Sequence, residues 1–323
     1  MQPLSIAENR NAAPVDPLPS WNQGIIKARI LNFVKNVTDS ESTNYITPED
    51  RIAVFDNDGT LWAEKPTYFQ GFFVLNRLEE LSKSNPEISR NPQLQQLLNK
   101  NFTNLQLLTK KDIMSLVMLT HSNITQHEFN RMVQKWAETA HHPQTQKRFV
   151  QMVYQPMNEL IDFLKHNHFK TFIVSGGGID FVREALSNVY GIPTDQIIGS
   201  SIKFKYISGT NMGNSTILRE PELASFNEKE VKPENIQLHI GKVPVFTAGN
   251  SDGDLEMLRY TADNNSPGKS LEILVHHDDG SREYSYDTGS ENVLIEAQRR
   301  NWTIVSMKDD FRIIYPNTNS ANY

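Results

Sequence analysis

Short apolar runs that each end in a polar or glycine-rich turn recur along the chain. RIAVF at 51–55 is followed by DNDGT, KTFIV at 170–174 by SGGG, and KVPVFTAG at 242–249 by NSDGD. Runs of this length bounded by turn residues are typical of buried strands, and a helical pattern follows the second and third turns. The repeated order of strand, polar turn and helix predicts a mostly parallel sheet covered by helices, an α/β fold.

A long helical block separates the first of these strands from the second. From 63 to 168 the apolar positions repeat at helical spacing, as in GFFVLNRLEELSK, PQLQQLLNK and EFNRMVQKWAETA, and prolines punctuate the pattern. We therefore expect an inserted helical domain at 63–168, and a core domain formed by 1–62 together with 169–323.

Several smaller elements complete the prediction. Residues 22–37 have helical spacing, 201–218 are typical of a β-hairpin with its turn in SGTNMGN, and WTIVSM at 302–307 is expected to be a last strand. Residues 1–20 are expected to form a loose arm.

Composition sets limits on the class of protein. The chain has 323 residues, 38% of them hydrophobic and 22% charged, with a formal net charge of −6. This mildly acidic balance argues against a basic nucleic-acid-binding surface. Cysteine is absent, which excludes disulfides and thiolate chemistry. No apolar run is long enough to predict a membrane span.

The polar, proline-containing start of the chain bears on location. MQPLSIAENRNAAPVDPLPSWN lacks the basic and apolar regions of a signal peptide. It resembles the lead that remains after a signal has been removed, so we weakly favour a periplasmic or secreted protein, and otherwise a cytoplasmic one. The oligomeric state stays open.

The first polar turn carries two acids. Asp56 and Asp58 lie two residues apart just past a strand, and Gly59 allows a sharp turn. Carboxylates this close repel each other unless a cation or a shared proton compensates, and Mg²⁺ with its preference for oxygen ligands is the natural choice. One acid could then attack phosphorus while the other moves a proton. The alternative is a turn that caps a helix without chemistry.

The other two turns suit the same chemistry. Ser175 and the backbone N–H groups of Gly176 and Gly177 form a candidate phosphate cradle, although a plain glycine turn is an alternative. Asn250, Asp252 and Asp254 offer oxygen ligands, although a simple helix N-cap explains them equally well. Ligands of parallel α/β folds bind at the carboxyl ends of the strands, so we expect the three turns to converge.

Taken together, these motifs resemble the haloacid dehalogenase (HAD) superfamily of phosphohydrolases. The resemblance rests on VFDNDGTLW, FIVSGGG, a lysine and AGNSDGDLEML, in that order, and covers about residues 50–305. It implies a Rossmann-like core, and the inserted helices resemble the helical-bundle cap of the phosphoserine-phosphatase-like branch.

The resemblance also implies roles for the two acids and for the groups that hold the phosphate. Asp56 would be the nucleophile that becomes an aspartyl phosphate. Asp58 would be the general acid and base, with its backbone carbonyl on the metal, and Thr60 would orient it. Ser175 and Gly176 would hold the transferring phosphoryl group.

Further residues complete the implied site. The lysine of the family matches Lys232 better than Lys242, and it would offset the charge between nucleophile and phosphate. Mg²⁺ would be held by Asp56 and Asp58 together with Asn250 and Asp254. Asn250 stands where the family usually has an acid, and Asp252 is a candidate to take over part of that role.

These features predict a Mg²⁺-dependent phosphatase that hydrolyses a small phosphorylated metabolite through an aspartyl phosphate. Phosphoryl transfer to another hydroxyl group is the nearest alternative, and Asn250 also leaves open a catalytically degenerate binding protein. Trp62, Glu64 and Tyr68 are candidates to face the substrate. The HHDD run at 276–279 invites a metal site, but neighbouring residues of a strand point to opposite faces.

Overall fold

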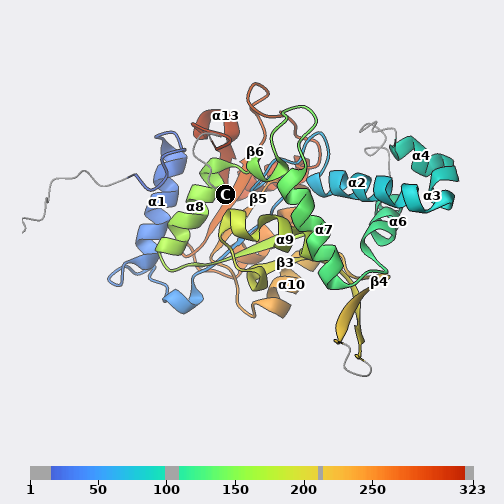
Figure 1. Ribbon diagram of the computed structural model, residues 1–323. Helices are drawn as coiled ribbons and strands as arrows, with labels where there is room; N and C mark the ends of the chain where they lie inside the picture. The colour runs from blue at the N-terminus through green and yellow to red at the C-terminus, as the bar shows by residue number, and fades with distance from the viewer. Residues whose placement is uncertain (1–15, 99–108, 210–213, 317–323) are drawn as a thin grey trace, which may run out of the picture.

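The computed structural model describes residues 16–98, 109–209 and 214–316 of the chain. A seven-stranded sheet with the order β4-β3-β2-β1-β5-β6-β7 forms its centre (Figure 1). All neighbouring strands are parallel except β3 and β4, which confirms the predicted α/β fold class. The strands are β1 Ile52–Phe55, β2 Lys170–Gly178, β3 Ile197–Ile207, β4 Thr216–Ser225, β5 Phe246–Gly249, β6 Leu271–His276 and β7 Thr303–Ser306.

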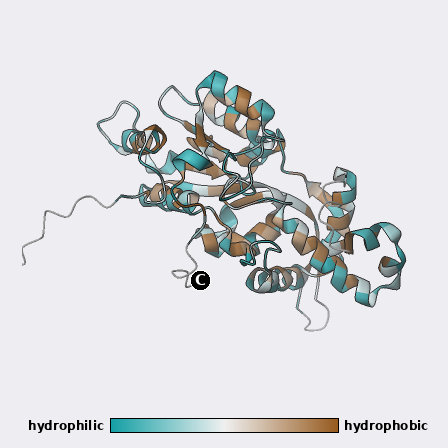
Figure 2. Ribbon diagram, turned by 90° about the horizontal axis from the view of Figure 1, so that it is seen from above, coloured by the Kyte–Doolittle hydropathy of each residue, from teal (hydrophilic) through white to brown (hydrophobic). Residues whose placement is uncertain are grey.

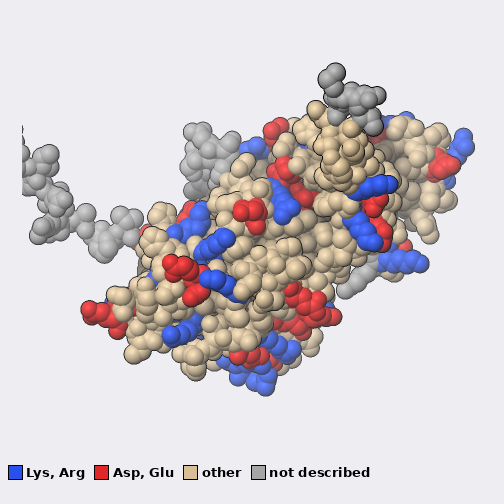
Figure 3. All heavy atoms as spheres, turned by 90° about the horizontal axis from the view of Figure 1, so that it is seen from below, with Lys and Arg blue, Asp and Glu red and all other residues tan. Residues whose placement is uncertain are grey.

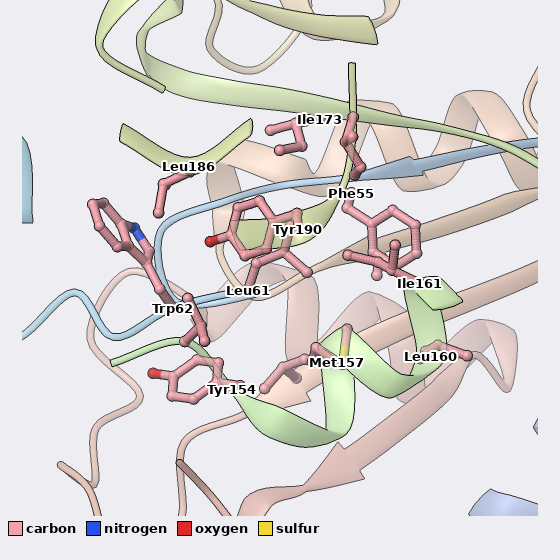
Figure 4. Packing of buried hydrophobic residues seen from close by; sticks show 14 of the residues in the cluster. Phe55, Leu61, Trp62, Tyr154, Met157, Leu160, Ile161, Ile173, Leu186 and Tyr190 are labelled. Carbon is pink, nitrogen blue, oxygen red and sulfur yellow. The ribbon is translucent and has the colours of Figure 1, made fainter. Parts of the chain in front are cut away.

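Helices cover both faces of the sheet because the strands are apolar on both sides. In β1, Ala53 and Phe55 belong to the main core, while Ile52 and Val54 belong to a second cluster on the opposite face. Figure 4 shows part of the main core, where Phe55 packs among side chains of α8 and α9. The helices beside the main core are α1 Ile25–Thr38, α8 Gln155–His166 and α9 Ile179–Tyr190; those of the opposite face are α10 Val231–His239, α11 Leu255–Asp263 and α12 Glu291–Arg300.

The inserted helices extend to one side of the sheet, away from α1 and α8 (Figure 1). Two of them begin with a capping box, at Thr109 and at Thr125, which satisfies their first free N–H groups. Helices are therefore present in the insertion as expected, and their division from the core as a separate cap domain stays a prediction. The cap helices are α2 Phe69–Ser84, α3 Pro86–Arg90, α4 Pro92–Leu98, α6 Lys110–His121 and α7 Gln126–Thr139.

The boundary between cap and core at residue 168 stays a prediction. Helix α8 lies inside the predicted cap range, yet it packs against β2, and Met157, Leu160 and Ile161 join the main core. Short helical segments complete the described chain, namely Pro48–Asp50, Phe149–Gln151, Thr194–Gln196, Asp252–Asp254 (η4) and α13 Met307–Asp310.

The antiparallel pair of β3 and β4 confirms the predicted hairpin and forms one edge of the sheet. The cap covers part of this edge, because the Asn123 N–H donates to the Arg219 carbonyl at 2.8 Å and the Arg219 N–H donates to the Ile124 carbonyl at 3.0 Å. A covered edge strand leaves fewer free backbone groups for unwanted pairing.

Charged residues of both signs lie on the outside of the described molecule. Helices carry hydrophilic as well as hydrophobic residues in the view from above (Figure 2), and Lys, Arg, Asp and Glu are interspersed on the face seen from below (Figure 3). Within the described ranges, we find no helix that is both long and apolar enough to span a membrane. Most of the predicted N-terminal arm, the end of the helix predicted at 92–100 and most of the hairpin turn lie outside these ranges.

Candidate active site

The three polar turns meet at one end of the sheet, as expected. Strand β1 lies between β2 and β5, so that Phe55 is paired with Ile173 on one side and with Ala248 on the other. Asp56, Ser175 and Asn250 follow closely after these positions and are all buried. The convergence is a consequence of strand order, since the carboxyl ends of neighbouring parallel strands share one edge.

Lys232 of α10 joins two acids at the centre of the site. Its Nζ donates to Asp56 Oδ1 and to Asp254 Oδ1, both at 2.6 Å, and its side chain is 2% exposed. Asp254 Oδ2 accepts from the backbone N–H groups of Asn250 at 2.9 Å and Ser251 at 3.0 Å. Asp254 thus holds Lys232 against Asp56. That Asp254 is also a metal ligand stays a prediction.

Charge is balanced unequally in this cluster. Burial raises the pKa of Asp56, and the charge of Asp254 raises it further, while Lys232 opposes both. Burial opposes the charge on Lys232, but Asp254 and Asp56 more than compensate and raise its pKa, so that the lysine stays a cation. One cation faces two carboxylates, so Lys232 alone compensates only one of them when both are ionised.

Asp58 lies beside this cluster and faces the glycine turn. A methyl group on Gly177 would lie 3.1 Å from Ser175 Oγ and 3.5 Å from Asp58 Oδ2. The Trp62 indole N–H donates to Asp58 Oδ1 at 2.8 Å. Burial, opposed by this hydrogen bond, raises the pKa of Asp58 to about 6, and the charge of Glu64 adds to the shift.

Thr60 has a different contact from the expected one. Its hydroxyl lies 3.2 Å from Asn250 Oδ1 and 3.4 Å from Asp56 Oδ2, whereas the group that orients Asp58 is the Trp62 indole. In this geometry the short Thr60 side chain reaches the Asp56 side of the turn, so its hydroxyl contacts Asp56 and Asn250 rather than Asp58.

The Ser175 turn is built differently from a simple turn into a helix. The glycines continue β2 to Gly178, with a shift of register after Val174, and α9 begins only at Ile179. The Gly177 N–H donates to Ser175 Oγ at 2.9 Å. A Cβ at Gly176 would lie 2.8 Å from Glu228 Oε2, so the end of that side chain would have to shift.

Other predicted candidates lie elsewhere. Lys242 is half-exposed and pairs at 2.7 Å with Asp50, which precedes β1, whereas Asp56 follows the other end of that strand. Asp252 accepts hydrogen bonds from the Asn292 side chain at 2.6 Å and the Val293 N–H at 2.8 Å. It therefore caps the start of α12, and its expected role in place of an acid at Asn250 stays a prediction.

The HHDD run has separate structural contacts. His276 pairs with Asp287, Asp278 binds Ser306, and Asp279 binds Arg282. Only His277 reaches the site, where its Nε2 donates to the Gly59 carbonyl at 2.8 Å. Among the described residues no three His, Cys, Asp or Glu side chains form a metal-binding group.

The predicted substrate-facing residues lie near Asp58. Glu64 is buried and accepts a hydrogen bond from the Tyr286 hydroxyl at 2.6 Å, while Lys65 Nζ lies 4.1 Å from the centre of the Tyr286 ring. Tyr68 is 58% exposed, and the charges of Glu64 and Asp58 raise its pKa. Trp62 is buried and holds Asp58, so of the three candidates Tyr68 alone is exposed.

Three residues of the site escaped sequence reasoning. Asn227 donates to the Ser175 carbonyl at 2.8 Å, Glu228 lies between Gly176 and Gly253, and Gln70 of the cap accepts from the Gly178 N–H. The only available signal was that Asn227 and Glu228 precede Lys232 by about one helical turn.

The oxygen donors beside Asp56 fit a hard divalent cation. Asp56 Oδ2 and Asn250 Oδ1 lie within reach of the same Thr60 hydroxyl, so a carboxylate and an amide oxygen are available side by side. Mg²⁺ prefers such oxygen ligands and retains several waters, which suits a site with few protein ligands. When both acids are ionised, the charge that Lys232 leaves uncompensated favours the same ion.

The mostly parallel α/β sheet, with Asp56 at the carboxyl end of a central strand and helices inserted after it, has the architecture that the family resemblance implies. A family model described as haloacid dehalogenase-like hydrolase matches residues 53–259. The chain belongs to this family and is a HAD-family hydrolase. No curated protein sequence matches the chain.

Solved structures share the fold at low sequence identity. A conserved, functionally unknown protein from Anaerococcus prevotii DSM 20548 has a TM-score of 0.54 at 15% identity, over 87% of this chain and 91% of that chain. A protein with unknown function from Bordetella pertussis Tohama I has a TM-score of 0.51 at 12% identity, over 79% and 97% of the two chains. Both likenesses bear on the fold alone.

Proposed function

We propose that this HAD-family hydrolase is a Mg²⁺-dependent phosphatase that hydrolyses a small phosphomonoester through an aspartyl phosphate on Asp56. The observation that carries the proposal is the arrangement around Asp56. This carboxylate lies 2.6 Å from the Lys232 ammonium, at the same sheet edge as the Ser175 turn, and Asp58 faces that turn from the other side.

In the first step an Asp56 oxygen attacks phosphorus, and the bond between phosphorus and the ester oxygen breaks. Asp58 donates its proton to that oxygen, so the product leaves as a neutral alcohol. Lys232 and the N–H groups of the glycine turn stabilise the negative charge on the transferring group. Mg²⁺ held by Asp56, Asn250 and the Asp58 carbonyl would offset further charge on the phosphoryl oxygens.

In the second step Asp58 is a carboxylate and accepts a proton from water. The water oxygen attacks phosphorus, the bond between phosphorus and the Asp56 oxygen breaks, and inorganic phosphate leaves with Asp56 again a carboxylate. A group that gives and then takes one proton works best with a pKa near the working pH, and burial places Asp58 in that range.

The test is hydrolysis of p-nitrophenyl phosphate with Mg²⁺ and with EDTA. Asp56→Asn should lower kcat by about a thousandfold or more, and acid-quenched wild-type protein should carry one phosphoryl group on Asp56. Asp252→Asn is the matched control, because Asp252 caps α12. Turnover of Asp56→Asn near the wild-type rate would refute the nucleophile assignment, and phosphate binding without any turnover would indicate a binding protein.

A further inference from the structure

A glutamine of the cap lies directly against the phosphate cradle. Gln70 is in the first turn of α2, and its Oε1 accepts a hydrogen bond from the Gly178 N–H at 2.8 Å. A Cβ on Gly177 would lie 3.2 Å from Gln70 Oε1, and a Cβ on Gly178 would lie 2.8 Å from Gln70 Nε2. The glycine turn therefore packs against this side chain as well as binding it.

The other end of the Gln70 amide is held by a buried histidine. Gln70 Nε2 lies 3.2 Å from His121 Nε2, and His121 Nδ1 lies 2.7 Å from Thr120 Oγ1. The Thr120 hydroxyl donates its hydrogen to the Leu116 carbonyl at 2.7 Å. It must therefore accept from His121 Nδ1–H, which leaves Nε2 as an acceptor for the Gln70 amide.

This order of donors fixes the orientation of Gln70. With its NH₂ group on His121, its carbonyl oxygen is the atom left to face Gly178. His121 is 2% exposed, and burial, with the charge of Arg219 beside it, lowers its pKa to about 3. The ring therefore stays neutral in the physiological range and keeps its acceptor nitrogen.

A second link joins the same histidine to the helix after the cradle. Arg219 donates from Nε to the His121 carbonyl at 2.7 Å and from an Nη to Asp180 Oδ2 at 2.6 Å. Asp180 lies in the first turn of α9. The residue His121 is thus tied to Gly178 through its side chain and to Asp180 through its backbone, on either side of the start of α9.

We propose that Gln70 is a positioning residue for the phosphate cradle. Held by neutral His121, it fixes Gly178, and this fixes the backbone of Gly176 and Gly177 beside it. Through the hydrogen bond from the Gly177 N–H to Ser175 Oγ, it also fixes the serine side chain that is proposed to face the phosphoryl group. The inference rests on the proposed phosphatase function and adds that the cap, rather than the core alone, sets the geometry of the cradle. Gln70 acts through Gly178 and is not a catalytic residue.

Gln70→Met tests the inference because it retains length but removes both hydrogen bonds. We expect the affinity for inorganic phosphate to fall about five- to tenfold, as for one lost hydrogen bond, with a rise in KM larger than the fall in kcat. The Gly178 amide should also exchange its hydrogen faster. Gln134→Met is the matched control, since Gln134 links the cap to Glu184 of α9 at 2.6 Å on the exposed surface.

Variants of His121 separate positioning from packing. His121→Gln places an acceptor oxygen near the position of Nε2 and should keep phosphate affinity within about twofold of wild type, whereas His121→Leu should behave like Gln70→Met. The inference is overturned if Gln70→Met binds phosphate like Gln134→Met and Gly178 exchange is unchanged. Absence of turnover in the wild-type protein would instead refute the proposed function, because Gly178 exchange and phosphate affinity can be measured without it.

Discussion

Replacing Lys232 with methionine should destabilise the fold as well as stop the reaction. The Lys232 and Asp254 side chains are 2% and 1% exposed, and Asp56 is buried beside them. Removing one partner of such a buried ion pair costs about 3–5 kcal/mol, because the remaining charge has lost its compensation. We therefore expect Lys232→Met to lower the free energy of unfolding by about this amount.

The exposed Lys242 provides the control for this change. Its ion pair with Asp50 has side chains that are 43% and 61% exposed, and such surface pairs contribute less than about 1 kcal/mol. Urea denaturation followed by tryptophan fluorescence measures both variants. Hydrolysis of p-nitrophenyl phosphate should be lost in Lys232→Met and retained in Lys242→Met.

A double variant separates charge from shape at this position. Adding Asp254→Asn to Lys232→Met removes one of the two carboxylates that have lost their cation, so stability should be partly regained while activity should not. If the free energies of unfolding of Lys232→Met and Lys242→Met differ by less than about 1 kcal/mol, the buried ion pair does not stabilise the fold as its geometry indicates, and the reasoning is wrong.

Two further predictions concern pH and backbone conformation. The His121 pKa is lowered to about 3 in the folded chain, so below about pH 6.5 the unfolded chain takes up a proton that the folded chain excludes. Between pH 6.5 and 5 the free energy of unfolding of wild type should therefore fall by about 2 kcal/mol more than that of His121→Gln. Equal losses of the two proteins in urea denaturation would contradict this. Gly59→Ala should remove activity and much stability, because φ is +79° and the added methyl would lie 2.0 Å from Asn250 Nδ2. Gly289→Ala, at φ +89° with nothing within 4 Å, should cost only about 1 kcal/mol of backbone strain; similar activity and stability of the two variants would show that the contact with Asn250 has no effect.

The parts of the site that sequence predicted are those fixed by local pattern and strand order. An apolar run before Asp56 and another before Ser175 identify neighbouring parallel strands, and their polar ends then have to meet. The choice of Lys232 over Lys242 needed the family resemblance, since both lysines lie near the ends of one short helix and nothing local shows which of them is buried.

The parts that sequence missed depend on contacts between distant segments. Gln70 contacts Gly178, which is 108 residues away in the chain, and His121, which is 51 residues away. In the sequence, Gln70 and His121 look like ordinary polar residues of helices. The contact of Thr60 differs from the expected one for a local reason. Which group a short side chain reaches within a turn depends on backbone dihedral angles, and the sequence pattern does not encode them.

The cap divides into two parts with different attachments. Its outer helices share a small apolar cluster, separate from the main core, that comprises Val74, Leu75, Leu78, Ile88, Leu97 and Leu116. Its inner part is bonded to strand β4 through Asn123 and Ile124, and α7 packs on α9.

Helix α2 belongs to both parts, because its Phe69, Phe72 and Phe73 join the main core while its next residues join the outer cluster. Since α2 also carries Gln70, which binds the Gly178 N–H, any displacement of this helix would be felt directly at the glycine turn.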